Sequence, residues 1–416
     1  MRTSIVFAMT LVPSAALAGG YIIPQETARE LGLAQSAVAD QTGAESVLLN
    51  PASLADQDGL DISASGELLI NRTDWSAPDL GSSSLITKPN APPSAAVSYS
   101  QLVKGSETRW GVGVGFDVPA GGSLEWPTGW PGQEYIQSVD QKVYRISAGA
   151  ALELLPYISF GATYVRYQGT EQLHQEINYI DHYGDASLGM SGGADTFSLG
   201  GLFHVPTTRL SLGAYYAYKA SATITGHVHF ADVPPSFQSM LYDQGVTESL
   251  TMPSVLHAGA AYDIIPQHLT VMATFDWEGW SVYHEDKFVG SGGLTILVPR
   301  NYSDAEVYRV GAEWSHVPFA APLTLRVGAL RSVSQQPADT VSPTLTDGDS
   351  WAFSLGAGVD VTHDVRIDVG WEHAFFDNVT AGGTETLPGT YKTMVDLVSL
   401  GLNWRIDLAG CSNCSK

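Results

Sequence analysis

Apolar and polar residues alternate along most of the chain between residues 60 and 406. In the segment 398–407, apolar side chains occupy Val398, Leu400 and every second position up to Ile406, with polar or small residues between them. The segment 364–372 has the same arrangement. A period of two is typical of β-strands with one apolar and one polar face. The pattern predicts an all-β protein, and it fits both a soluble sandwich and a membrane barrel.

The alternating segments divide into fourteen predicted strands whose connections are short and long in turn. This alternation is typical of outer-membrane barrels, which have short turns at one end and longer loops at the other. We therefore predict a transmembrane antiparallel β-barrel of about fourteen strands over residues 59–407. The predicted strands lie at 60–74, 93–103, 109–117, 140–154, 157–172, 193–204, 209–218, 248–264, 267–288, 300–316, 321–334, 349–361, 364–380 and 389–406. The longer connections include 173–192, 219–247 and 335–348.

The charge balance excludes some functions and places constraints on others. The 416 residues include 43 Asp and Glu against 20 Lys and Arg, which gives a formal net charge of −23. Nucleic-acid binders show basic patches, so we expect no nucleic-acid partner. Lys or Arg on a lipid-facing surface costs about 2 to 4 kcal/mol at the midplane, so charges should line the lumen or the loops. Fourteen strands enclose more space than their side chains fill, which calls for a plug or an open pore.

The chain begins with the features of a secretory signal peptide. Met1 and Arg2 precede a short apolar run, and Ala16 and Ala18 occupy the positions that a signal peptidase reads. We therefore expect residues 1–18 to be removed and the protein to be exported. At the other end, residues 408–416 form a predicted periplasmic tail. Its cysteines, Cys411 and Cys414, either form a local disulfide or have no consequence.

Residues 19–58 differ from the strands, because small residues and short helical stretches dominate them. Four motifs occur there in order, namely Gly20-Tyr21, Leu31-Gly32-Leu33-Ala34, Val38-Ala39-Asp40 and Asn50-Pro51-Ala52. With these motifs, and with strand segments such as 280–283, 308–314 and 399–404, the chain resembles the FadL family of outer-membrane long-chain fatty acid transporters. It departs from the family where Asp407 to Lys416 continue beyond the last strand, and where Ser350 replaces the usual arginine.

The resemblance implies a barrel with an N-terminal hatch over residues 19–58, located in the bacterial outer membrane. It implies passive uptake of long-chain fatty acids or similar hydrophobic molecules, with capture outside, rearrangement of the hatch and lateral release through the barrel wall. The expected partners are the hydrophobic ligand, outer-membrane lipid and lipopolysaccharide, and the barrel assembly machinery, and the expected state is a monomer. An importer of aromatic hydrocarbons is the alternative within the same family.

Two segments are candidates for the hatch and its gate. Asn50, Pro51 and Ala52 combine a fixed proline φ with a side chain that bonds neighbouring backbone, which suits an anchor between hatch and barrel. In the third strand, the glycines at 111, 113 and 115 share one face, which allows a ligand or another backbone to come close. We interpret Gly111, Gly113 and Gly115 as a lateral exit, and tight packing against the hatch is the alternative.

Cations and exposed aromatic rings are the candidate ligand contacts. By position, Arg166 and Lys287 match family cations near a ligand head group. Strict alternation faces Arg166 outward, and snorkelling at the membrane interface is the alternative. Trp126 and Trp130 lie in a proline-containing connection, where exposed aromatic rings would form a capture surface.

Catalytic and metal-binding motifs are weak in this sequence. Ser191 has the spacing of a nucleophile elbow, but it lies in a glycine-rich connection without the strand, turn and helix that such chemistry needs. His227 and His229 share a face, but no third ligand is evident. We therefore expect no enzyme activity, no metal and no cofactor. A lipid esterase using Ser191 and a structural or adhesin barrel are the alternatives from other classes.

Overall fold

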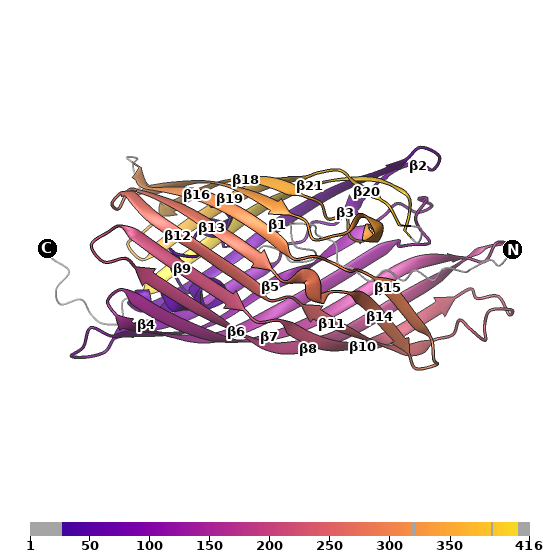
Figure 1. Cartoon of the computed structure of the whole chain (residues 1–416), viewed down its shortest axis with the longest axis horizontal. Helices are drawn as coiled ribbons and strands as arrows, with labels where there is room; N and C mark the ends of the chain where they lie inside the picture. The colour runs from indigo at the N-terminus through magenta and orange to yellow at the C-terminus, as the bar shows by residue number, and fades with distance from the viewer. Residues whose placement is uncertain (1–26, 318–321, 384–385, 407–416) are drawn as a thin grey trace.

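One antiparallel sheet closes on itself to form a barrel (Figure 1). The structure is a computed structural model that describes residues 27–317, 322–383 and 386–406. The barrel closes where β1 pairs with β21, from Leu60 opposite Ile406 to Ser76 opposite Thr390. The fold class predicted from the alternation, a barrel of fourteen strands, is confirmed. The predicted signal peptide and the two tail cysteines lie outside the described residues.

Nine wall strands are continuous and five are interrupted. The continuous strands are β1 (Gly59–Ala77), β4 (Pro93–Leu102), β5 (Arg109–Glu125), β6 (Ser138–Leu155), β7 (Ile158–Asn178), β8 (Tyr183–His204), β17 (Leu323–Val333), β18 (Ser350–Asp360) and β21 (Gly389–Ile406). The interrupted strands are β9 (Leu210–Ala217) with β10 (Ala220–Ala231), β11 (Gln244–Met252) with β12 (Val255–Ile265), β13 (Leu269–Glu278) with β14 (Glu285–Gly290), β15 (Thr295–Pro299) with β16 (Ala305–Val317), and β19 (Val365–Phe376) with β20 (Val379–Ala381). Two short strands, β2 (Gly81–Ser84) and β3 (Ile86–Thr87), follow β1.

The wall extends further toward the end with long loops than the sequence predicts. Much of the predicted connections 173–192 and 219–247 is strand, because β7, β8, β10 and β11 continue into them. Ser191 lies within β8, opposite Thr170 and Thr225, and not in a loop. These extensions have polar residues on the outer face, so they do not show the outward apolar face by which membrane strands are recognised.

The apolar face of the wall changes from outside to inside along the barrel axis. In β9 the outward residues include exposed Leu212, whereas in β10 the inward residues include buried Ile224 and Val228. The inward residues are odd-numbered in β9 and even-numbered in β10, so the alternation must shift by one residue between these strands. The break at 218–219 provides this shift. Without that shift, Ser221 and Thr223 would point inward and Ile224 would face water.

A compact hatch occupies the lumen near the end with short turns. It consists of α1 (Ala28–Leu31), α2 (Ser46–Leu49) and the 3-10 helix η1 (Pro51–Asp56), and most of its side chains are buried. None of the helices in the described ranges is long and apolar enough to cross a bilayer. These helices are too short to be stable alone, so the hatch depends on its packing against the wall.

Glycines in the wall make room for the hatch backbone. A Cβ atom added to any one of these glycines would overlap hatch atoms, because the two backbones are in direct contact. The strands β7, β8, β9, β16, β17 and β19 each contribute one, namely Gly161, Gly200, Gly213, Gly311, Gly328 and Gly370. The wall and the hatch are therefore matched in shape around most of the barrel.

The Asn50-Pro51-Ala52 segment lies at the centre of this contact. Asn50 Oδ1 accepts from Ala52 N at 3.2 Å, and Asn50 Nδ2 donates to Val38 O at 2.9 Å. Pro51 is buried at the start of η1, where its missing N–H needs no partner. Thus one side chain both forms a local turn and joins two parts of the hatch.

A pair of neighbouring glycines in β8 tests whether this fit holds the hatch in place. A Cβ on Gly200 would overlap the Asn50 side chain and Ala52 N, whereas a Cβ on Gly201 meets no atom within 4 Å. We expect Gly200→Val to weaken hatch docking by about 1 to 3 kcal/mol, the usual cost of overpacking. Limited proteolysis in detergent should then cut the hatch faster, while heat-modifiable gel mobility still shows a folded barrel. Gly201→Val is the control, and equal proteolysis of both variants would contradict the idea.

Candidate functional site

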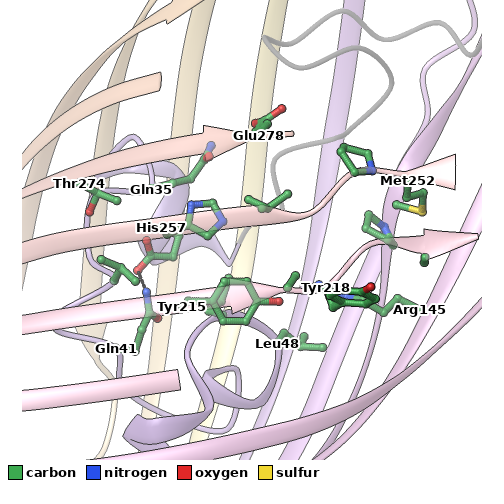
Figure 2. Close-up of a pocket in the computed structure, with 18 of the residues that line it drawn as sticks. Gln35, Gln41, Leu48, Arg145, Tyr215, Tyr218, Met252, His257, Thr274 and Glu278 are labelled. Atoms are coloured by element: carbon green, nitrogen blue, oxygen red, sulfur yellow. Dashed lines mark hydrogen bonds between the residues drawn. The ribbon is translucent and has the colours of Figure 1, made fainter. Parts of the chain in front are cut away.

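A cavity of about 160 Å³ lies between the hatch and the wall (Figure 2). The hatch contributes residues such as Val38, Gln41 and Leu48, and the wall contributes Tyr215 and Met252. The other lining residues are Glu30, Gln35, Leu49, Pro119, Arg145, Tyr167, Ala217, Tyr218, Ala220, Pro253, Val255, His257, Thr274, Glu278 and Arg309. Aliphatic and aromatic side chains thus form much of its surface, and a few charged groups lie at its edge.

Both arginines of the cavity are neutralised by buried carboxylates. Arg145 forms a two-point ion pair with Asp117, in which its Nε donates to Oδ1 at 2.8 Å. Arg309 forms an ion pair with Asp276, which also bonds the His257 ring.

Two further carboxylates, Glu30 and Glu278, lie at the cavity surface. Glu278 accepts from Trp280 Nε1 at 2.8 Å. Burial raises the pKa of Glu30 above its usual value, and Arg29 opposes this shift. The cavity therefore has no surplus of positive charge, since each of its two arginines is paired with a buried aspartate.

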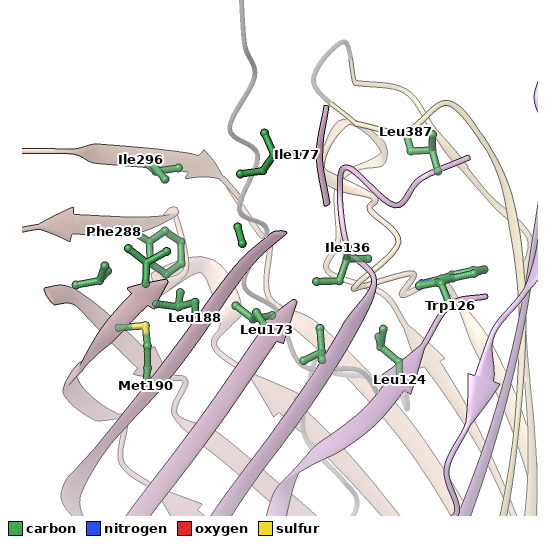
Figure 3. Close-up of a cluster of buried hydrophobic side chains, with 14 of the residues drawn as sticks. Leu124, Trp126, Ile136, Leu173, Ile177, Leu188, Met190, Phe288, Ile296 and Leu387 are labelled. Carbon is green, nitrogen blue, oxygen red and sulfur yellow. The ribbon is translucent and has the colours of Figure 1, made fainter. Parts of the chain in front are cut away.

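Above this cavity, a cluster of buried apolar side chains covers the inner wall. We call it the lumen cluster (Figure 3). Its members include Leu124, Trp126, Trp130, Ile136, Val139, Leu173, Ile177, Leu188, Met190, Ile224, Val228, Phe230, Phe288, Ile296, Val341 and Leu387. Trp126 and Trp130 stack at 4.2 Å between ring centroids. These side chains are almost completely buried against one another, so this level of the lumen is packed with apolar groups that water solvates poorly.

One connection folds into the lumen, although the sequence predicts an external loop over 335–348. Its residues 340–348, which we call the inner loop, are all buried. Val341 packs in the lumen cluster, and Pro343 O accepts from Trp126 Nε1 at 3.4 Å. Leu345 packs instead in a second cluster that includes Trp280 and Tyr302. The inner loop therefore lies between the lumen cluster and the level of the cavity.

Ion pairs join the underside of the hatch to the wall around a second cavity of about 420 Å³. Arg29 bonds both Asp40, at 2.7 Å, and Glu313, at 3.0 Å. Arg326 bonds Glu313 at 2.6 Å and Asp368 at 2.7 Å. Removing one member of such a buried network usually costs about 3 to 5 kcal/mol, because it leaves a charge unpaired.

The structure places the glycines of the third strand against the hatch. Cβ atoms at Gly111, Gly113 and Gly115 would meet side chains or backbone of Leu54, Val47 and Leu48. The ladder is continuous on both edges of β5 at these glycines. It becomes irregular on the β6 side between Asp117 and Ala120, closer to the end with long loops. The exit role of the three glycines stays a prediction.

The two predicted ligand cations lie on the outer face. Arg166 pairs with exposed Asp195 at 2.7 Å and is itself well exposed. In β14, Asp286 and Phe288 point inward, so Lys287 points outward. Neither cation lines the cavity. Among the described residues, no three His, Cys, Asp or Glu side chains gather in a way that could hold a metal ion.

The expectation that Trp126 and Trp130 are exposed is wrong, because both are buried in the lumen cluster. Their part in ligand binding stays a prediction. Sequence reasoning missed Arg145, Arg309 and Asp276, which lie at the cavity. The sequence does contain a signal for these three residues. In an alternating strand whose apolar face is outward, a charged residue on the other face must point into the lumen.

Comparisons with known proteins agree with this architecture. The family model described as outer membrane protein transport protein (OMPP1/FadL/TodX) matches residues 9–405. A Pseudomonas aeruginosa FadL homologue superposes with a TM-score of 0.82 at 16% identity, covering 93% of this chain and 100% of that one. The Pseudomonas putida toluene transporter TodX gives 0.71 at 16%, covering 94% and 99%. The Ralstonia pickettii toluene transporter TbuX gives 0.65 at 17%, covering 90% and 98%. No curated protein matches the chain.

The closed barrel has a hatch and a cluster of buried apolar side chains in its lumen, and the matching family model is that of outer-membrane transporters of hydrophobic compounds. The family model covers nearly the whole chain, so the chain belongs to the FadL/TodX family. The resemblance drawn from the sequence motifs is confirmed, as is the location in the outer membrane.

We expect the docking of the hatch to depend on pH through the buried carboxyl of Glu45. Burial raises the pKa of its carboxyl to about 8 from an ordinary value of 4.5, with a smaller contribution from Asp368 and an opposing one from Arg29. Between pH 4.5 and pH 8 the carboxyl of Glu45 is expected to be protonated in the docked hatch, whereas the carboxyl of an exposed glutamate is ionised. Docking should therefore weaken as pH rises from 4.5 to 8, by up to about 1.4 kcal/mol per pH unit.

Limited proteolysis of the hatch across this pH range measures the effect. We expect faster cleavage in the native protein as the pH rises, and a flatter profile in Glu45→Gln, which cannot lose a proton. A protease whose rate is calibrated on an unfolded peptide removes the enzyme's own pH dependence. A native profile that matches Glu45→Gln would count against this role of Glu45.

Proposed function

We propose that this protein carries compact, uncharged hydrophobic molecules passively across the outer membrane, with one-ring aromatic compounds as the preferred size. The observation that carries the proposal is the cavity between hatch and wall. Its volume of about 160 Å³ is close to the roughly 150 Å³ of an apolar protein cavity that binds benzene. The rings of Tyr167, Tyr215 and Tyr218 suit contact with another ring.

The charges around the cavity support a neutral ligand over a free carboxylate. A fatty acid anion needs a cation that is available to it, but Arg145 and Arg309 are already paired with Asp117 and Asp276. Two more carboxyl groups, Glu30 and Glu278, would face the ligand. Burying an unpaired anion there is unfavourable. The long-chain fatty acid expected from the sequence is therefore the competing substrate.

The apolar path above the cavity supports entry from outside the cell. A molecule captured by the lumen cluster would pass the inner loop and then reach the cavity, with each step over buried apolar surface. The similar structures include two toluene transporters, and toluene is a compound of the proposed class. We infer transport by diffusion without a catalytic step. A monomeric state and assembly by the barrel machinery also belong to this proposal.

Two alanines in β9 provide a matched test of the cavity. Ala217 lines the cavity, whereas Ala214 is exposed on the outer face of the same strand. Ala217→Phe should fill much of the cavity and lower toluene influx at least about tenfold, the factor equivalent to about 1.4 kcal/mol. Ala214→Phe should leave influx unchanged.

The measurement is influx of labelled toluene and, separately, labelled oleate into cells that lack their own transporters. Each variant is compared at equal amounts of folded barrel. Influx of oleate but not toluene through the native protein would overturn the preferred substrate. Influx of neither would overturn the proposed function.

A further inference from the structure

Several polar side chains of the cavity already have hydrogen-bond partners within the protein. Besides the two paired arginines, Thr274 Oγ1 donates to Ser36 O at 2.7 Å. Gln41 Nε2 donates to Glu30 Oε1 at 3.1 Å. A polar group on a ligand must therefore find its partners elsewhere in the lining.

The side-chain amide of Gln35 is one polar group of the lining that has no such partner. Gln35 lines the cavity, and its Nε2 is buried without a hydrogen-bond partner among the described residues. A buried N–H without a partner is costly. A half turn about the last side-chain bond exchanges the amide nitrogen and oxygen, so the amide offers a ligand either a donor or an acceptor.

The wall fixes the strained turn of the hatch that carries Gln35. Ala34 and Gln35 both adopt left-handed backbone conformations, with φ of 50° and 58°. Residues other than glycine rarely adopt this region, and such strain persists only where the surroundings impose it. Here Arg309 Nη1 donates to Ala34 O at 3.2 Å, and the bond from Thr274 holds Ser36 O on the other side of Gln35.

His257 is a second polar group of the lining with an unused bond. Its Nδ1 bonds Asp276 Oδ1, and Asp276 also pairs with Arg309. A carboxylate only accepts hydrogen bonds, so Nδ1 carries the proton and Nε2 of the neutral ring is an acceptor. The His257 side chain lines the cavity and is 31% exposed, and Nε2 has no partner in the part of the chain that the structure describes.

Gln35 and His257 lie on the same side of the cavity. Asp276 is the ladder partner of His257, and Thr274 lies two residues before Asp276 on β13. The turn that carries Gln35 is bonded to Thr274 and to Arg309, which flank Asp276. Figure 2 shows Gln35 and His257 at one end of the view of the cavity. An amide and a ring nitrogen are therefore both available there.

The rest of the lining suits an aromatic ring. Tyr215 is the ladder partner of His257, and its ring stacks on the imidazole at 5.5 Å between centroids. Val38, Leu48 and Met252 add apolar surface. Contacts between aromatic rings are favourable beyond the area that they bury. The cavity thus combines an apolar volume for one ring with a polar end for one substituent.

We propose that the cavity selects one-ring aromatic compounds that carry a hydroxyl group, such as phenols, over hydrocarbons of the same size. A hydroxyl both donates and accepts a hydrogen bond, so it would donate to His257 Nε2 and accept from the Gln35 amide. A methyl group in its place leaves both protein groups without a partner, which is unfavourable. This inference rests on the proposed function and adds which members of the ligand class bind best.

Two fluorinated ligands provide the test, because para-fluorophenol and para-fluorotoluene differ only in a hydroxyl and a methyl group. Their binding to the purified full-length protein in detergent is measured by fluorine NMR. Ala217→Phe, whose cavity is filled, gives the background from detergent. We expect the native protein to bind para-fluorophenol at least as tightly as para-fluorotoluene, although water solvates the phenol better.

Gln35→Leu removes the amide and keeps a side chain of similar size. We expect it to weaken binding of para-fluorophenol about tenfold, the effect of one or two lost hydrogen bonds, and to leave binding of para-fluorotoluene within about twofold of native. Gln267→Leu is the matched control, because Gln267 is an exposed glutamine with φ of 64° in the turn between β12 and β13, outside the cavity. It should change neither affinity.

His257→Phe tests the other half of the site. It removes Nε2, keeps a ring beside Tyr215 and leaves Asp276 paired with Arg309. We expect the same selective loss of para-fluorophenol, at a folded amount checked by heat-modifiable gel mobility. Equal weakening of both ligands in the two variants, or tighter native binding of para-fluorotoluene, would overturn the hydroxyl site and leave the proposed function standing. Binding of neither ligand by the native protein would overturn both.

Discussion

Every wall strand must keep its backbone bonded to its neighbours while its outer face meets lipid at one level and water at another. An unpaired backbone group in lipid is costly, so the sheet has to close, and a closed sheet leaves each strand only two faces. The apolar face must then be outside in the membrane and inside above it. Leu212 and Ile224, on consecutive segments of one wall strand, show this reversal. In this strand the break at 218–219 exchanges the faces. In the continuous strands β7 and β8 the alternation keeps its phase, and only the residue types on each face change.

The reversal also explains why the lumen is apolar where it opens to the outside. Above the membrane, side chains that would face lipid lower down turn inward and form the lumen cluster. The buried Trp126 and Trp130 are part of it, and the inner loop closes over it from the side. The inside of the barrel is therefore apolar at a level where its outer surface is polar.

Two kinds of contact hold the hatch, and they have different consequences. Glycine contacts such as that between Gly200 and Asn50 depend on shape and leave no room for an added atom. Ion pairs such as Arg29 with Glu313 depend on charge and respond to protons and salt. The cavity borders both the hatch and the break in the wall at 218–219, where Ala217, Tyr218 and Ala220 line it.

The alternation of apolar and polar residues was enough to predict the barrel, its number of strands and the order of short and long connections. This is because a period of two depends only on the local geometry of a strand and on which of its faces meets lipid. The role of Asn50-Pro51-Ala52 as an anchor between hatch and barrel stays a prediction. The sequence did not reveal the extended strands, the inner loop or the break in the wall at 218–219. Residues such as Thr223 and Val341 are surrounded by residues that are far away in the sequence. The face that a strand turns inward depends on its register, and a shift of one residue in the register reverses the two faces.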